Sequence, residues 1–211
     1  MRTRIKVCGI TRLDDALRAA DLGVDALGFV FWPGSPRYVP PCDAAAIASA
    51  LPPFVATVGV FVDQPLDEIR TIAAGVGLSA IQLHGEEPPG MWTNLPGRCI
   101  RAIGVGAGFD PVALAALPPS VWPLLDAHDR ERRGGTGRAI DWDLAAKAAR
   151  ARRIILAGGL GPSNIRLAVA RVRPFAVDVS SGVEREPGIK DMDRLRAFVE
   201  GVAAADAAQV P

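Results

Sequence analysis

Cysteine and histidine are scarce in this chain, which has three cysteines and two histidines among 211 residues. Cys8, Cys42 and Cys99 are an odd number with no CxxC spacing, and neither histidine lies in an HxH or HExxH pattern. These absences argue against a disulfide framework and against a metal site, and they favour a reducing compartment, the cytoplasm. We therefore expect no metal and a cytoplasmic location.

Long apolar runs and an excess of charge are also lacking. Glycine, proline or a charged residue interrupts each apolar run within about ten residues, which is too short to cross a bilayer. The formal net charge is only +1, so nothing indicates a surface for nucleic acid or for an anionic membrane. The segment 1–4 leads into a strand pattern without the apolar core of a signal peptide. We expect neither nucleic-acid nor membrane partners.

What the chain does contain is a regular alternation of β-rich segments and segments suited to helices. The strand-to-strand spacing of roughly 20–30 residues is the length of a βα unit. Strict alternation predicts an α/β protein with a parallel sheet covered by helices, and eight units fit a closed (β/α)8 barrel, the TIM barrel. The predicted strands are 5–9, 26–31, 57–62, 80–84, 99–105, 121–127, 154–158 and 175–180. The predicted helices are 13–21, 42–51, 66–74, 111–117, 143–149, 163–170 and 191–205, with a weak one at 86–95 that contains Pro88, Pro89 and Gly90.

An open doubly wound sheet is the alternative fold, although no GxGxxG pattern follows the first predicted strand. No shift in composition marks a linker, so we expect one domain over residues 1–211. The alanine-rich tail from about residue 202 to 211 is expected to fray beyond the last helix.

Polar side chains on the strands are expected to point into the barrel, because residues two apart share a face and the alternate positions are apolar. Lys6 and Asp178 are then either an internal ion pair or directly catalytic. Nearer the mouth, Cys8 is either a small buried hydrophobe or an active-site thiol, and His84 is either a core histidine or a substrate contact. Asp126 ends a very apolar strand, where a carboxylate is a helix cap or a site acid; its place at the carboxyl end of a strand favours the site.

Two turns rich in glycine and serine follow the seventh and eighth strands, at Gly158 and Gly159 and at Ser180-Ser181-Gly182. Backbone N–H groups in such turns can approach an anion closely, so they are either a phosphate site or simple tight turns. Arg37 follows the second strand between prolines and is either a bidentate partner for a carboxylate or an exposed solubilising residue. The glycine-rich loop 129–137 suits a lid or a solvated loop.

Nine segments spread over almost the whole chain match one known family in order. They are KVCGIT at 6–11, GFVFWPGSPRYV at 28–39, VGVFV at 58–62, IQLHGEE at 81–87, LLDA at 124–127, GGTGRAIDW at 134–142, LAGGL at 156–160, DVSSGVE at 178–184 and GIKD at 188–191. Through these segments the chain resembles the phosphoribosylanthranilate isomerases of tryptophan biosynthesis. The resemblance implies a (β/α)8 barrel that binds a small phosphorylated substrate and needs no cofactor or metal. The implied reaction is the Amadori rearrangement of N-(5-phosphoribosyl)anthranilate to 1-(2-carboxyphenylamino)-1-deoxyribulose 5-phosphate.

The resemblance also assigns roles to residues. It matches Cys8 to the general base, Asp126 to the general acid and Arg37 to the residue that holds the anthranilate carboxylate, and the two glycine turns to the phosphate loops. The two catalytic roles require a protonated carboxyl group beside a thiolate. Ordinary pKa values, about 3.9 for an aspartic acid and about 8.5 for a cysteine, favour the opposite distribution by roughly 6 kcal/mol. We therefore expect the productive distribution of protons only with substrate bound.

Three alternatives stay open: a related isomerase, a non-catalytic binding protein, and either of two oligomeric states. The related isomerase nearest in chemistry is the aminoimidazole-carboxamide ribotide isomerase of histidine biosynthesis. Its site resembles one with two aspartates, so Cys8 favours the anthranilate substrate and leaves a dual-substrate enzyme open. A non-catalytic binder of phosphorylated metabolites would need neither Cys8 nor Asp126. The sequence is compatible with a monomer or a homodimer.

Overall fold

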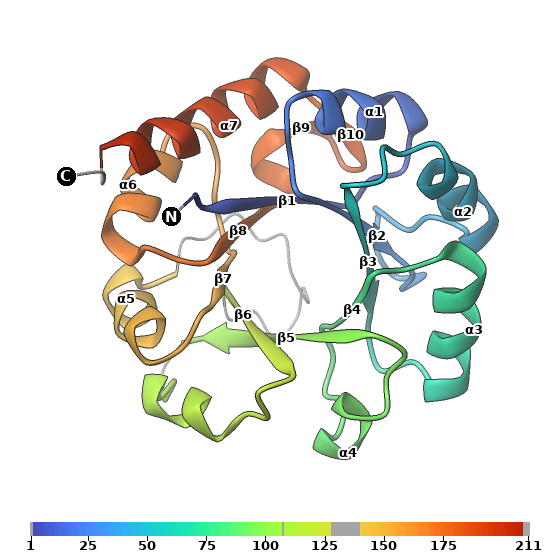
Figure 1. The fold of residues 1–211 in the computed structure, drawn as a ribbon, viewed down its shortest axis with the longest axis horizontal. Helices are drawn as coiled ribbons and strands as arrows, with labels where there is room; N and C mark the ends of the chain where they lie inside the picture. Colours follow the sequence, from blue (N-terminus) through green and yellow to red (C-terminus); the bar gives the residue numbers. More distant parts are fainter. Residues whose placement is uncertain (1, 107, 128–139, 209–211) are drawn as a thin grey trace.

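The computed structural model describes residues 2–106, 108–127 and 140–208. Within these residues eight parallel strands close into a barrel in sequential order from β1 to β8, and the helices form a ring outside it (Figure 1). The predicted (β/α)8 barrel is therefore confirmed, and the open sheet is ruled out. The loop 129–137, which we considered as a lid, lies outside the described residues.

The strand and helix bounds follow the predicted alternation closely. The barrel strands are β1 (Arg4–Cys8), β2 (Ala26–Val30), β3 (Ala56–Phe61), β4 (Ala80–Leu83), β5 (Arg98–Val105), β6 (Val121–Ala127), β7 (Ile155–Leu156) and β8 (Ala176–Val179). The helices are α1 (Leu13–Asp21), α2 (Pro41–Ser49), α3 (Leu66–Val76), α4 (Pro89–Trp92), α5 (Trp142–Ala151), α6 (Ile165–Val172) and α7 (Met192–Ala207).

Two spacers contain less α-helix than the others. The one expected to be weakest forms only the four-residue α4, because prolines and a glycine interrupt it. The segment expected as a helix over 111–117 is a 3-10 helix, η1 (Pro111–Ala116). A short 3-10 helix, η2 (Ser181–Val183), and a hairpin of β9 (Glu184–Glu186) and β10 (Ile189–Lys190) follow β8 and were not predicted.

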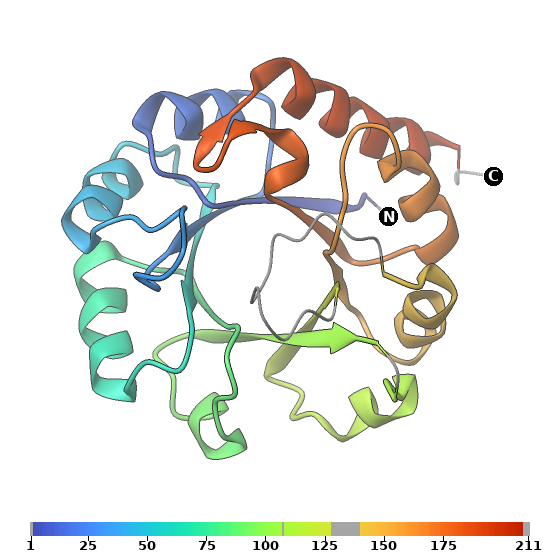
Figure 2. The ribbon, with the colours of Figure 1, turned by 180° about the vertical axis from the view of Figure 1, so that it is seen from behind.

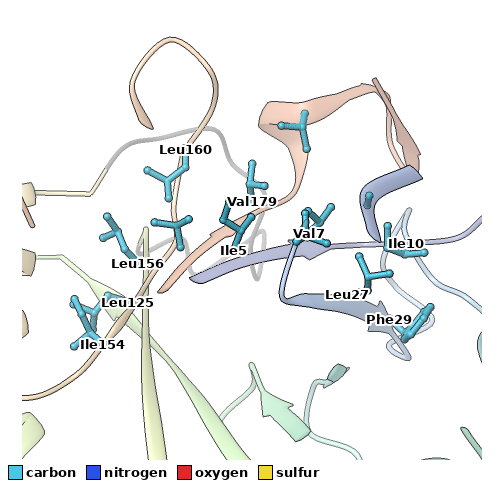
Figure 3. Packing of buried hydrophobic residues seen from close by; sticks show 14 of the residues in the cluster. Ile5, Val7, Ile10, Leu27, Phe29, Leu125, Ile154, Leu156, Leu160 and Val179 are labelled. Carbon is cyan, nitrogen blue, oxygen red and sulfur yellow. The ribbon is translucent and has the colours of Figure 1, made fainter. Parts of the chain in front are cut away.

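The main core lies between the barrel and its helices. Alternate strand residues such as Val7, Leu27 and Leu125 are fully buried there, as Figure 3 shows from close by. Burying side chains of this size contributes about 1.5–3 kcal/mol each. A smaller apolar layer is formed by Val58, Ala80, Ile100, Leu124, Ile155, Ala157 and Ala176, the strand positions that alternate with the outer ones.

The expected frayed tail is wrong for most of its length. Helix α7 continues to Ala207, Ala205 is buried, and the carboxylate of Asp206 accepts hydrogen bonds of 2.7 Å from the backbone N–H and the hydroxyl of Thr3. Alanine favours helix, and these contacts fasten the helix end beside the start of β1. The start of β1 and the end of α7 accordingly lie on the same side of the barrel (Figure 2).

Among the described helices, none is both long enough and apolar enough to span a membrane.

Candidate active site

The predicted site residues converge on one cavity of about 460 Å³ at the carboxyl ends of the strands. A barrel places its strand ends together at this face, so residues far apart in sequence meet there. Gly182 is not among the described residues that line the cavity, and it packs instead against Leu160 and Gly161 of the turn after β7. The predicted residues in the lining are Cys8, Arg37, His84, Asp126, Gly158, Gly159, Ser180 and Ser181.

Cys8 is the last residue of β1 and is partly buried. The chain turns immediately afterwards at Gly9, whose φ of +77° suits glycine. On the neighbouring strand, a Cβ at Gly28 would lie 3.0 Å from Cys8 Sγ and 3.1 Å from Lys6 Nζ, so glycine there leaves room for both groups. Burial raises the pKa of the Cys8 thiol, and the nearby Lys6 cation opposes that effect only in part.

Lys6 and Asp178 form the internal ion pair that was one of the two predictions for them. They are direct cross-strand partners on β1 and β8, and Lys6 Nζ lies 2.9 Å from both carboxylate oxygens of Asp178. Burial by itself would lower the pKa of Lys6, but the Asp178 carboxylate raises it above its ordinary value, so Lys6 is charged. Asp178 also reaches the cavity lining.

Asp126 points toward the cavity from the end of β6, with His84 opposite it. The carboxylate accepts a 2.7 Å hydrogen bond from the backbone N–H of Ala127, and its second oxygen lies 3.4 Å from His84 Nε2. Gln82 of β4 lies at the other nitrogen of the imidazole, with its Nε2 3.1 Å from His84 Nδ1. The His84 side chain is 16 % exposed and lines the cavity beside the candidate acid, so it is not a core histidine.

Arg37 is not an exposed solubilising residue, because its side chain is 14 % exposed. Its guanidinium makes a bidentate contact with Glu184, with Nε at 3.0 Å from Oε1 and Nη2 at 2.7 Å from Oε2. Glu184 in turn binds Lys190, whose Nζ lies 2.7 Å from Oε1. Sequence reasoning missed Glu184 and Lys190. They stand inside the segments DVSSGVE and GIKD, but nothing local marks their charges as buried.

The two glycine turns lie against each other beside the cavity. Gly158 and Gly159 both have positive φ, +81° and +64°. Asn164 fastens the first turn by donating to the carbonyl of Gly159 at 2.8 Å and accepting from the N–H of Gly161 at 2.9 Å. Such fixed backbone at the ends of strands seven and eight is typical of phosphate sites in barrels. The remaining lining includes apolar side chains from several loops and strands, among them Val30, Trp32, Val60, Val62 and Pro187.

The site has a thiol and a carboxyl group across the barrel mouth, an arginine at the rim and two fixed glycine turns. These features are typical of barrel enzymes that act on small phosphorylated substrates. Comparison with known proteins narrows the class. The family model of N-(5'-phosphoribosyl)anthranilate isomerase matches residues 5–201. The chain belongs to this family.

Individual relatives agree with the family. The N-(5'-phosphoribosyl)anthranilate isomerase of Geobacter sp. strain M21 is 50 % identical over 200 residues, covering 93 % of this chain and 96 % of the relative. The crystal structure of the Thermotoga maritima enzyme superposes with a TM-score of 0.89 at 43 % identity, covering 96 % and 99 % of the two chains. A phosphoribosyl anthranilate isomerase in complex with reduced 1-(o-carboxyphenylamino)-1-deoxyribulose 5-phosphate gives a TM-score of 0.85 at 42 % identity, with the same coverage.

Proposed function

We propose that this protein catalyses the Amadori rearrangement of N-(5'-phosphoribosyl)anthranilate to 1-(2-carboxyphenylamino)-1-deoxyribulose 5-phosphate in tryptophan biosynthesis. Cys8 is the general base and Asp126 the general acid. The observation that carries the proposal is the meeting of these two groups with Arg37 and the two glycine turns around one cavity. A non-catalytic phosphate binder would have no use for the thiol and the carboxyl group.

Proton transfers account for the reaction. Asp126 donates a proton to the furanose ring oxygen, so that the C1–O bond breaks and an iminium forms between C1 and the anthranilate nitrogen. Cys8 then removes the proton at C2, and the electron pair of that C–H bond forms the C1=C2 bond of an enolamine. Gain of a proton at C1 and loss of the proton from the 2-hydroxyl group then give the ketone. Substrate and product are isomers in which C1 is reduced and C2 is oxidised, so the chemistry requires no external oxidant or reductant. We therefore propose a reaction without metal or cofactor.

The deprotonation of Cys8 to the thiolate is the step that needs help. Burial raises the pKa of its thiol, so the thiol form dominates at neutral pH before substrate binds. Lys6 and Lys190 both act in the opposite direction. We infer that the productive pair, a thiolate at Cys8 and a carboxylic acid at Asp126, assembles with the anionic substrate in the cavity.

The binding groups match the ends of the substrate. The turns at Gly158-Gly159 and Ser180-Ser181 would hold the phosphate through backbone N–H groups, with Gly182 shaping the second turn. Arg37 would hold the anthranilate carboxylate, and the wall with Trp32, Val60 and Pro187 would pack against its ring. His84 would contact the substrate beside Asp126. The solved relative in complex with the reduced product analogue supports a phosphorylated small-molecule substrate.

The decisive experiment follows the fluorescence decay of phosphoribosylanthranilate with the wild-type protein, Cys8→Ala and Asp126→Asn. We expect turnover in the wild type and a loss of about 10²–10⁴-fold in kcat for each variant, with near-normal substrate binding for Asp126→Asn. A flat signal with the folded wild type would reject the function. Unchanged turnover in one variant would remove that residue from the mechanism.

We further propose that the protein works in the cytoplasm as a monomer or homodimer, without nucleic-acid or membrane partners. The near-neutral net charge of +1 supports the absence of such polyanionic partners. Light scattering during gel filtration decides the assembly, since the two states differ twofold in mass.

A further inference from the structure

Behind the cavity lies a pair of buried, oppositely charged side chains to which the mechanism above gives no role. Glu184 and Lys190 come from the two strands of the β9–β10 hairpin, and their side chains are 4 % and 0 % exposed. They contact each other at 2.7 Å. Burying two charges is costly and seldom stabilises a protein more than apolar packing would, so the contacts of the pair with the site need an explanation.

Lys190 reaches the strand that carries the candidate base. Its Nζ donates a 2.6 Å hydrogen bond to the backbone carbonyl of Cys8. This carbonyl is at the end of β1, where the chain turns at Gly9. Lys190 therefore fixes the last peptide unit of β1, from which the Cys8 side chain extends into the cavity.

Glu184 reaches the candidate carboxylate clamp on the other side. Its carboxylate contacts Arg37 through Nε and Nη2, which is the side edge of the guanidinium. A guanidinium has five N–H donors, so this contact leaves the outer edge, between Nη1 and Nη2, for a second carboxylate. Within the described part of the chain, Nη1 has no hydrogen-bond partner.

The turn that follows the base also packs against the clamp. A Cβ at Gly9 would lie 2.5 Å from Cδ of Arg37, so the turn after Cys8 packs against the arginine stem. The hairpin itself is held to the same turn, since Thr11 Oγ1 donates to the carbonyl of Gly188 at 2.6 Å. One hairpin thus holds both halves of the site.

We propose that Glu184 and Lys190 are positioning residues: Glu184 sets the orientation in which Arg37 receives the substrate carboxylate, and Lys190 sets the peptide that carries Cys8. The proposal rests on the proposed function, because it assumes that Arg37 binds a carboxylate. Burial would raise the pKa of Glu184, but the hydrogen bonds from Arg37 and Lys190 hold it below its ordinary value, so Glu184 is ionised at neutral pH. Burial lowers the pKa of Lys190, and the Glu184 carboxylate opposes that effect.

The test compares two ligands of the folded protein by calorimetry: the reduced product analogue, which has the carboxylate, and ribulose 5-phosphate, which lacks it. For Glu184→Gln we expect Kd of the analogue to rise about tenfold or more, and Kd of ribulose 5-phosphate to change less than about twofold. KM should rise with the first value, while kcat stays within a few-fold.

Asp143→Asn is the matched control. Asp143 makes the same bidentate contact with an arginine, Arg171, but on the exposed surface of α5 and α6. Its loss should leave both affinities and both kinetic constants unchanged. Glu184→Asp is the second variant in case Glu184→Gln does not fold: it keeps the charge but shortens the reach, and it should again weaken the analogue selectively.

Lys190→Met tests the second part of the proposal, that Lys190 positions the peptide that carries Cys8. We expect kcat to fall about tenfold or more with KM changed less than threefold, and Lys190→Arg to restore at least part of kcat. Equal weakening of both ligands by the Glu184 variants, or a Lys190→Met effect confined to thermal stability, would overturn the proposal.

Arg37→Gln separates this proposal from the proposed function. If Arg37→Gln leaves binding of the analogue unchanged, Arg37 does not bind the substrate carboxylate, and that assignment in the proposed function is rejected. If Arg37→Gln weakens the analogue but Glu184→Gln does not, only the positioning role is rejected.

Discussion

The three cysteines lie in three different environments, which affect the reactivity of their thiols. Cys42 is exposed at the start of α2, Cys8 is partly buried at the cavity, and Cys99 is buried in β5. Burial raises the pKa of Cys99 to about 11, with Arg101 opposing the effect. Burial also raises the pKa of Cys8 above its ordinary value of 9.0, against the opposing Lys6. Thiolate is the reactive form, so these environments set the order of reactivity.

Alkylation with iodoacetamide at pH 7.5 should therefore modify Cys42 first, Cys8 more slowly and Cys99 last. The rate at Cys8 should rise as the pH increases through and beyond 9, because a thiol with this raised pKa is converted to the thiolate only at such pH values. Mass spectrometry of peptides sampled over time measures the three rates. The reduced product analogue should protect Cys8 but not Cys42. Faster reaction at Cys8 than at Cys42 in the free protein would mean that its thiolate already exists at neutral pH.

At the scale of elements, the turns after β7 and β8 pack closely against each other because a glycine, Gly182, lies at their contact. A Cβ at Gly182 in η2 would collide with the carbonyl oxygen of Leu160 and would lie 3.0 Å from Cα of Gly161. The collision is with backbone, which cannot rotate away. Glycine at 182 therefore explains how the two turns come close to each other beside the cavity, although Gly182 is not among the described residues that line it.

Gly182→Ala should push the two turns apart and raise KM for phosphoribosylanthranilate about tenfold or more, with a loss of roughly 1–3 kcal/mol in stability. Gly161→Ala is the steric control, because its Cβ would meet only ordinary contacts at 3.6 Å with Gly182. Initial rates and urea unfolding measure both variants. Equal KM values for the two variants would show that close approach of the turns is not needed.

Some of the elements could be predicted from the sequence alone, and others could not. Apolar alternation and regular spacing predicted the eight strands, and glycine turns at strand ends predicted Gly158, Gly159 and the Ser180-Ser181 turn in the lining. The β9–β10 hairpin escaped prediction because its strands have three and two residues and no apolar alternation. It is held by tertiary contacts, such as those of Lys190 with Cys8 and Glu184. A buried charge reads like a surface charge in a sequence, so Glu184 and Lys190 were missed with it.

At the scale of the whole molecule, the barrel closes where the first strand meets the last. β1 and β8 pair in register from Arg4 with Ala176 to Val7 with Val179, and Lys6 lies opposite Asp178 within this register. The pair joins two strands that are 172 residues apart in sequence. The charges are buried and satisfy each other, so removing only one leaves an unpaired charge in the interior.

Lys6→Met should therefore destabilise the protein by about 3–5 kcal/mol, because Asp178 loses its partner in a low-dielectric site. The double variant Lys6→Met/Asp178→Leu should recover most of that loss, since an apolar pair of similar volume fits the barrel interior. The control is Arg4→Met on the same strand. Arg4 pairs with Asp25 at 3.0 Å, but its side chain is 52 % exposed, so its loss should cost no more than about 1 kcal/mol. Urea unfolding followed by circular dichroism measures all three variants independently of activity, which matters because Asp178 lines the cavity. A Lys6→Met cost no larger than that of Arg4→Met would mean that apolar packing alone closes the barrel.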